Sequence, residues 1–300
     1  MTAHSPEAAP AARRPVGAPD ATRLVLGGVA MEVCPAPGLP WSLGEEHRTM
    51  ARAFEATPVV GSVRCAVGRF PGGSRGPQPD PAAPRTVAWR WGAERARLST
   101  LGVELALRRL GAGQYVARGA VEPERGGPSS LCTALACAVV LREGGLVLHA
   151  TAVELRGRAV LFIGPRGAGK TTAAHQCRNG RWMARDRAAV FETGGAWHVA
   201  GLCGGDPIRL PQSAAAALPV AAVLRVRRGD GPATALRELH PAEALVALRE
   251  SVQRAGDAED EERVLDAASR LLASVPVAEA RTVIGPDLEP PIAALLEERS

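Results

Sequence analysis

The sequence predicts an α/β fold with a mixed sheet, preceded by a smaller α+β module. The first observation is a pair of apolar, strand-like runs, LVLHATAVEL (146–155) and RAVLFIG (158–164), separated by the turn pair Arg156-Gly157. The second is the glycine-rich segment GPRGAGKTT (164–172), which follows directly and leads into a helical pattern. The third is a series of short strand-like runs in the first third of the chain, separated by Pro- and Gly-rich loops.

These patterns divide the chain into three parts. Residues 1–21 are rich in Pro and Ala and lack the apolar core of a secretion signal, so we expect a disordered tail. Residues 22–128 form the α+β module, and residues 129–300 form the second domain. Strands in the module are predicted at residues 23–33, 58–69, 85–91 and 114–121.

The second domain alternates helices and strands. It opens with a helix, SSLCTALACAVVLRE, capped by Ser129 or Ser130. A second helix runs from about Lys170 to the C-cap signal Asn179-Gly180. Further helices are predicted after Pro241, after Asp257 and at the C-terminus. Strands are predicted at residues 146–155, 158–164, 181–192, 196–201 and 280–285.

Composition bounds the classes of function. With 300 residues and an apolar fraction of 46%, the chain can bury a core, although aromatic residues make up only 3%. The net charge of +5 comes from scattered arginines, which suits a phosphate-rich ligand. A nucleic-acid partner is not expected, because there is no basic stripe with interleaved aromatic residues.

The cysteines and the apolar runs indicate the compartment. None of the six cysteines forms a C-x-x-C pair, and none has a histidine at metal-ligand spacing, so we expect neither disulfides nor structural zinc. No apolar run reaches about 18 residues, so no membrane-spanning helix is predicted. A cytoplasmic, reducing location is therefore expected.

The glycine-rich segment carries the strongest chemical signal. It matches G-x-x-x-x-G-K-[ST] at every fixed position and contains Lys170, the only lysine beside 35 arginines. Glycine lets backbone N–H groups turn toward phosphate oxygens, and a slender ammonium fits inside such a loop where a planar guanidinium does not. A neighbouring hydroxyl can bind Mg²⁺. We therefore predict ATP binding with Mg²⁺ through Gly164, Pro165, Arg166, Gly167, Ala168, Gly169, Lys170, Thr171 and Thr172.

A transporter-type ATPase would share this loop. Such proteins also need an apolar strand ending in Asp-Glu and an LSGGQ-like signature. The sequence offers only LCGGD (202–206) and AAVLRVRR (221–228), whose apolar run ends in arginine. Without these carboxylates a water nucleophile has no base, so this class is disfavoured.

Residues 146–190 resemble HPr kinase and its smaller relatives, some of which occur in biosynthetic clusters for lasso peptides. The shared arrangement is a strand carrying His149, a turn, a second strand, the phosphate loop, one helix and then ARDRAAV (184–190). A looser resemblance covers residues 20–300 and includes PIRLP (207–211) and a helix opening with HPAEAL (240–245). The resemblance implies a kinase with the nucleotide-binding fold shared with phosphoenolpyruvate carboxykinase.

The resemblance also implies roles for individual residues. His149 matches the family histidine near the phosphate loop, and Asp186 matches the second aspartate of an acidic pair that binds metal or deprotonates the acceptor. Lys170, His149 and Asp186 are thus the expected catalytic residues, with Thr171 and Asp186 as metal ligands. The first position of the pair is Arg185 instead of Asp, and Arg185 could contact the γ-phosphate.

Other interpretations of these residues stay open. His149 could be a buried core histidine, and Asp186, between two arginines, could be a surface ion-pair residue. Asp206 and Arg209 follow a Gly-rich loop where the family has substrate or metal contacts, and they are further candidates.

The predicted function is transfer of the γ-phosphate of ATP to a hydroxyl. By resemblance, the acceptor is Ser or Thr of a peptide or protein, for instance a ribosomally made precursor, and a small-molecule hydroxyl is the alternative. HPr itself is not expected, because the family's long glycine-rich signature is missing. The alternatives are a catalytically inactive nucleotide-binding regulatory module, because of Arg185, and an ATPase. The oligomeric state is open, a homo-oligomer included.

Overall fold

The computed structural model describes most of the chain. The described residues are 21–43, 59–69, 88–91, 95–100, 103–122, 127–202, 217–229, 234–252 and 258–297. The predicted tail and the loop carrying Asp206 and Arg209 lie outside these ranges. The protein is mixed α/β, as expected, with two sheets that each contain parallel and antiparallel pairs.

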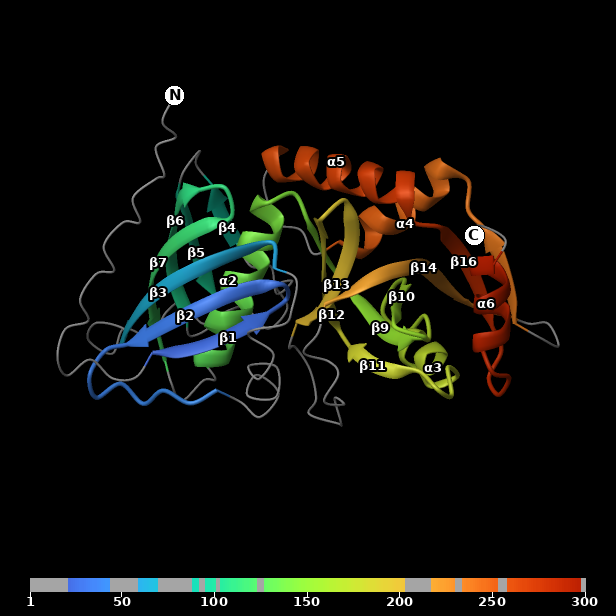
Figure 1. Ribbon diagram of the computed structural model, residues 1–300, viewed down its shortest axis with the longest axis horizontal. Coiled ribbons are helices and arrows are strands. Elements are labelled where there is room, and N and C mark those ends of the chain that lie inside the picture. Colours follow the sequence, from blue (N-terminus) through green and yellow to red (C-terminus); the bar gives the residue numbers. More distant parts are fainter. Residues whose placement is uncertain are drawn as a thin grey trace, which may run out of the picture.

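The first sheet has seven strands in the order β1-β2-β3-β7-β6-β5-β4 (Figure 1). The pairs β2–β3 and β3–β7 are parallel, and the other pairs are antiparallel. Their bounds are β1 Thr22–Leu26, β2 Val29–Pro35, β3 Gly61–Arg69, β4 Ala88–Trp91, β5 Arg95–Thr100, β6 Val103–Gly111 and β7 Gln114–Val121. Strands β5 and β6 are not among those predicted, although buried Val103, Leu105 and Leu107 alternate with exposed residues in β6, which is a strand pattern.

Helix α2 (Gly127–Arg142) covers one face of this sheet. It begins before Ser129, with Pro128 in its first turn, where a missing N–H costs nothing. Almost every side chain from Leu131 to Leu141 is buried, as expected for a helix that is apolar on all sides. These side chains belong to the same core as the seven-stranded sheet, although the predicted division of the chain falls after residue 128.

The second sheet has nine strands and contains the glycine-rich loop. Its main path is β11-β9-β10-β14-β13-β12-β8, and β16 adds to β14 and carries β15 (Figure 1). Strand β14 is parallel to β10 on one side and to β16 on the other. The bounds are β8 Leu146–Leu148, β9 Ala150–Leu155, β10 Arg158–Ile163, β11 Arg181–Ala184, β12 Arg187–Thr193, β13 Ala196–Leu202, β14 Leu218–Arg228, β15 Ala235–Glu238 and β16 Val277–Thr282.

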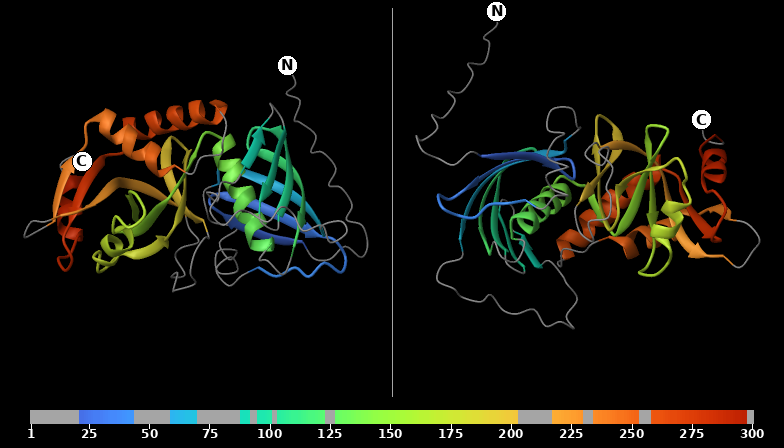
Figure 2. Two further views of the ribbon diagram at one scale, coloured as in Figure 1. Left: turned by 180° about the vertical axis from the view of Figure 1, so that it is seen from behind. Right: turned by 90° about the horizontal axis from the view of Figure 1, so that it is seen from below.

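Helices cover both faces of the β9–β10–β14–β16 layer (Figure 2). Helices α4 (Pro241–Ser251) and α5 (Ala258–Ser274) pack on one face, and α3 (Lys170–His175) and α6 (Glu289–Glu297) pack on the other. Because side chains alternate along a strand, Val223 of β14 lies in the core with α4, while the next residue, Leu224, lies in the core with α3. No helix within the described ranges is long and apolar enough to cross a membrane.

Strands β12 and β13 contribute to two cores. Phe191 and Leu202 are buried in the core of the first sheet, whereas Val190 and Val199 are buried in the core under α4 and α5. The β1–β2 turn closes this contact: a Cβ atom added to Gly28 would lie 2.1 Å from the ring of Phe191. The two sheets therefore share one hydrophobic layer.

Three predicted elements are shorter in the structure. The single strand predicted at residues 146–155 is interrupted at His149, and the one predicted at 181–192 is interrupted at Arg185 and Asp186. Both breaks occur where the chain passes from the β9–β10 part of the sheet to the β8–β12 part. Helix α3 ends at His175, before Asn179, because the next residue, Gln176, is buried against the C-terminal segment.

Candidate functional site

The glycine-rich loop lies between β10 and α3, as predicted. Its three glycines have positive φ angles, namely 140° at Gly164, 83° at Gly167 and 98° at Gly169, which L side chains rarely adopt. A Cβ atom at Gly164 would also lie 3.2 Å from the carbonyl oxygen of Val226 on β14. At Gly167 no atom lies within 4 Å of an added Cβ, so this part of the loop is open. The loop therefore has the backbone geometry that lets amide groups turn inward around an anion.

Lys170 is buried at the start of α3. Its ammonium donates hydrogen bonds to the carbonyl oxygens of Gly164 at 2.8 Å and Pro165 at 3.1 Å. Burial lowers the pKa of Lys170, and the negative charge of Asp186 opposes this shift. Within the described residues these two carbonyls are the acceptors of the ammonium, so one of its three N–H groups is available to a ligand.

The rest of the loop faces outward. Pro165, Arg166 and Gly167 are exposed, and the N–H of Ala168 donates to the Pro165 carbonyl oxygen at 3.1 Å, which closes a turn. Thr171 is partly buried and Thr172 is exposed.

His149 and Asp186 come together at the two strand breaks. Nδ1 of His149 lies 3.1 Å from Oδ1 of Asp186, and the side chains are 42% and 40% exposed. The backbone fixes both: the N–H of His149 donates to the Ser251 carbonyl oxygen at 2.7 Å, and the N–H of Ala150 donates to the Asp186 carbonyl oxygen at 3.2 Å. His149 is thus no core histidine, and its hydrogen-bond partner is the acidic residue that the sequence singled out.

The charge of Asp186 is stabilised from several sides. The hydrogen bond from His149 is the main cause that lowers the pKa of Asp186, partial burial opposes it, and the positive charges of Arg187 and Lys170 add to the lowering. Nε of Arg187 lies 3.9 Å from Oδ2. Asp186 is therefore an ionised carboxylate at neutral pH, close enough to Lys170 for each charge to shift the pKa of the other.

Arg185 is placed by its backbone. Its carbonyl oxygen accepts a hydrogen bond from the Thr151 hydroxyl at 3.0 Å, and the residue is partly buried. No ion pair of its side chain occurs within the part of the chain that the structure describes. A contact with a γ-phosphate stays a prediction.

The donors at the site suit Mg-ATP. A hard, partly hydrated Mg²⁺ prefers carboxylate, hydroxyl and phosphate oxygens, and Asp186 and Thr171 supply the first two. Among the described residues there is no group of three His, Cys, Asp or Glu side chains that could hold a metal ion. The five described cysteines are free thiols.

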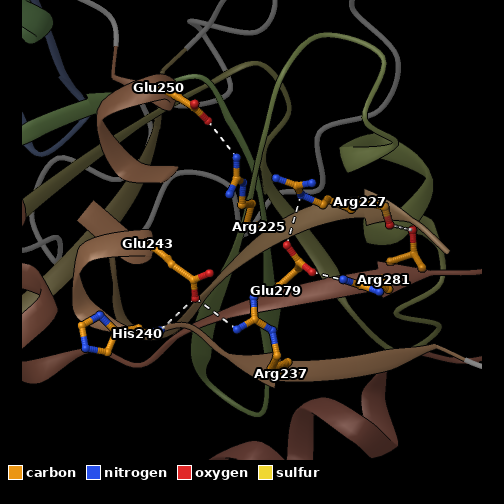
Figure 3. A network of polar contacts seen from close by, with 9 residues as sticks. Arg225, Arg227, Arg237, His240, Glu243, Glu250, Glu279 and Arg281 are labelled. Carbon is orange, nitrogen blue, oxygen red and sulfur yellow. Dashed lines mark hydrogen bonds and ion pairs between the residues drawn. The ribbon is translucent and has the colours of Figure 1, made fainter. Parts of the chain in front are cut away.

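Sequence reasoning missed a group of arginines at the ends of β14 and β16. Three of them form ion pairs with Glu250 and Glu279 (Figure 3): Arg225 and Arg227 lie on β14, and Arg281 lies on β16. The signal that could have found them is the RVRR run at the carboxyl end of a strand, the end at which α/β sheets bind ligands.

Comparisons with known proteins give likenesses to solved structures but no match to a family model or a curated sequence. Among solved structures, the Hpr(Ser) kinase/phosphatase from Coxiella burnetii is similar over 50% of this chain and 91% of its own, with 10% identical residues and a TM-score of 0.26.

Proposed function

We propose that this chain is an ATP- and Mg²⁺-dependent kinase that phosphorylates a hydroxyl, with Ser or Thr of a peptide or protein as the acceptor. The observation that carries the proposal is that Asp186, paired with His149, lies close enough to Lys170 for their charges to interact. Lys170 belongs to a loop whose glycines have positive φ angles. Only Lys170 and the loop are close in sequence to one another. A chance match to the loop pattern would not bring the ionised Asp186 carboxylate and its partner His149 to the same place.

The residues have distinct roles in the proposed reaction. The loop amides and Lys170 bind the phosphates, and Thr171 and Asp186 would hold Mg²⁺, which would supply positive charge next to the phosphate oxygens. The acceptor oxygen forms a bond to the γ-phosphorus, the bond from that phosphorus to the bridging oxygen breaks, and ADP leaves with the electron pair. The hydroxyl proton passes to the Asp186 carboxylate, which His149 orients through Nδ1.

A second candidate is a nucleotide-binding module without catalysis. It is favoured by Arg185, which stands where the resembling family has an aspartate and leaves one carboxylate at the site. This candidate predicts Mg-ATP binding with no phosphorylated product. An ATPase would release ADP without any acceptor.

The test combines three measurements on the full chain: Mg-ATP affinity by calorimetry, ADP release, and phosphate incorporation into a serine- and threonine-containing peptide library by mass spectrometry. We expect Asp186→Asn to lower phosphate incorporation at saturating Mg-ATP by a factor on the order of 10²–10⁴, because a positioned base contributes that much. Asp266→Asn is the matched control, since Asp266 is an exposed residue of α5 paired with Arg270.

Each outcome points to one candidate. Incorporation that depends on Asp186 and persists in Asp266→Asn supports the kinase. Binding with neither incorporation nor ADP release supports the inactive module. ADP release at the same rate with and without peptides supports the ATPase, and an absence of Mg-ATP binding removes all three.

A further inference from the structure

The carboxyl end of β14 carries arginines beside the phosphate loop. Strands β10 and β14 are parallel with Ile163 opposite Arg225, so the next residue of each strand, Gly164 and Val226, are also neighbours. The carbonyl oxygen of Val226 would contact a Cβ at Gly164 at 3.2 Å. Arg225 and Arg227 thus flank the residue against which the loop packs, and Arg228 beside them is exposed.

A buried carboxylate fixes two of the arginines that surround it. Glu279 on β16 has a side chain only 5% exposed, and its two oxygens accept separate bonds, from Nε of Arg227 at 3.1 Å and from Nε of Arg281 at 3.0 Å. Figure 3 shows the two guanidinium groups approaching Glu279 from different sides. Each uses only its Nε in these ion pairs, and the arginine side chains are 53% and 65% exposed.

This arrangement leaves the terminal N–H groups of two oriented guanidiniums for an anion. The forked N–H groups of arginine match carboxylate and phosphate oxygens in pairs. Neighbouring carboxylates do not neutralise the positive charge of this site. Arg225 pairs with Glu250 at 3.0 Å and Arg237 with Glu243 at 3.1 Å, so the four labelled arginines of Figure 3 outnumber its three glutamates.

Arg225 lies on the face of the sheet that α4 covers. Arg225 and Glu250 lie on the α4 face, whereas α3, which begins at Lys170, packs on the opposite face. The residue after Glu250, Ser251, accepts the hydrogen bond from the His149 N–H. The sheet order therefore places His149 and Asp186 on the β9 and β11 side of the loop and the arginines on the β14 and β16 side.

We propose that Arg227 and Arg281, oriented by Glu279, bind carboxylate side chains of an acidic peptide, which is the acceptor. The term acceptor rests on the proposed kinase function, whereas the anion site does not. From β9 to the β14–β16 pair is two to three strand spacings, about 10–15 Å. An extended peptide covers this distance in about three to five residues, so the carboxylates lie three to five positions from the phosphorylated hydroxyl.

The test uses a labelled decapeptide with one serine and two glutamates three and five positions away, and the same peptide with glutamine. Fluorescence anisotropy gives the affinity of each for the full chain in the presence of Mg-ATP, and calorimetry gives the affinity for Mg-ATP alone. The variants are Arg227→Gln/Arg281→Gln, Glu279→Gln and, as a matched control, Arg64→Gln, since Arg64 is an exposed arginine paired with Glu32 on the first sheet.

We expect the glutamate peptide to bind at least about tenfold more tightly than the glutamine peptide, because hydrogen bonds between charged groups are stronger than those to a neutral amide. The double variant abolishes this preference and keeps its Mg-ATP affinity, and Arg64→Gln changes neither. Glu279→Gln weakens the preference because the guanidinium groups lose their orientation. It does so although the substitution removes one negative charge and makes the site more positive. Thermal melting shows that the variants are folded, and the double variant, with both arginines exposed, decides the matter if Glu279→Gln unfolds.

Several results would overturn the proposal. These are equal binding of both peptides, an unchanged preference in the double variant, or tighter peptide binding by a folded Glu279→Gln, which indicates unspecific charge attraction. A loss of Mg-ATP affinity in the double variant would assign the arginines to nucleotide phosphates instead. If the wild type fails to bind Mg-ATP but keeps an arginine-dependent preference, the kinase function fails while the anion site stands.

Discussion

His149 and Asp186 belong to different strand connections, and their side chains meet with Nδ1 of one 3.1 Å from Oδ1 of the other. Each follows or precedes a short strand, and backbone hydrogen bonds to Ser251 and Ala150 fix the two breaks in the chain. The pair is half-exposed beside the loop that carries Lys170. Several properties of the molecule follow from this and from the contacts around it.

The His149–Asp186 pair makes stability depend on pH in a defined window. Because the folded pKa of Asp186 is lowered, its ionised form stabilises the fold above the unfolded pKa of about 3.9, and this contribution is lost as the pH falls through the folded value. Urea unfolding should show wild type more stable than Asp186→Asn at pH 6, with the difference shrinking toward pH 3. In a His149→Ala background the pH-dependent part should largely vanish, and a difference that is equal at both pH values would contradict this account.

Lys170→Ala should weaken Mg-ATP binding by about 10- to 150-fold, the equivalent of one charged hydrogen bond of about 1.5–3 kcal/mol. Lys170→Arg should not restore the affinity, because the guanidinium is too broad for the space between the Gly164 and Pro165 carbonyls. Calorimetry measures both variants, and circular dichroism checks the fold. Arg178→Ala, an exposed cation beyond α3, is the control and should bind like wild type. Unchanged affinity in Lys170→Ala would remove the loop from nucleotide binding.

Gln176 connects α3 to the C-terminal segment. The Nε2 group of its buried side chain donates to the carbonyl oxygens of Val283 at 2.6 Å and Pro286 at 2.9 Å. The main-chain carbonyl oxygen of Gln176 accepts from the Leu288 N–H at 3.0 Å. Gln176→Ala should lower the free energy of unfolding by about 1–3 kcal/mol, since two hydrogen bonds of about 0.5–1.5 kcal/mol each are lost. Gln176→Glu should cost more, because a carboxylate cannot donate to either. Urea denaturation measures both, and equal stability of Gln176→Glu and wild type would contradict this role.

Gly28 holds the contact between the first sheet and Phe191. Its φ is 76°, and a Cβ would lie 2.1 Å from the Phe191 ring, so Gly28→Ala combines backbone strain with overpacking and should cost at least about 2 kcal/mol. Gly194→Ala is the matched control: its φ is 60° with no atom within 4 Å, so only the strain of about 1–2 kcal/mol applies. Denaturant midpoints of the two variants test the ranking. A Gly194 variant less stable than the Gly28 variant would argue against the tight contact.

Much of the site could be predicted because its signals are local. The loop needs glycines and Lys170 at fixed spacing between a strand and a helix, and β10 and α3 lie there. The strand breaks at His149 and Asp186 could not be predicted, because neither position has Gly or Pro. They arise from pairing with β12 on one side and β10 on the other, which no local propensity encodes.

The arginine site shows the same limit. Arg225 and Arg227 resemble ordinary strand-end arginines until Glu279, from a strand far along the chain, is placed opposite Arg225. The early end of α3 likewise depends on a distant segment, through Gln176. Charge and spacing within a segment allowed the loop to be predicted, whereas contacts with partners from elsewhere in the chain could not be predicted.

The layer formed by β12 and β13 bears on how this protein can be rebuilt. Phe191 and Val190 are consecutive yet belong to different cores, so exchanging everything before residue 129 for another module would leave Phe191 and Leu202 without their neighbours and α2 without its sheet. A chimera that keeps residues 129–300 intact would have to redesign that surface or carry the original module along. The first sheet is therefore a separate unit in strand topology, but it cannot be exchanged alone without exposing the side chains that pack against it.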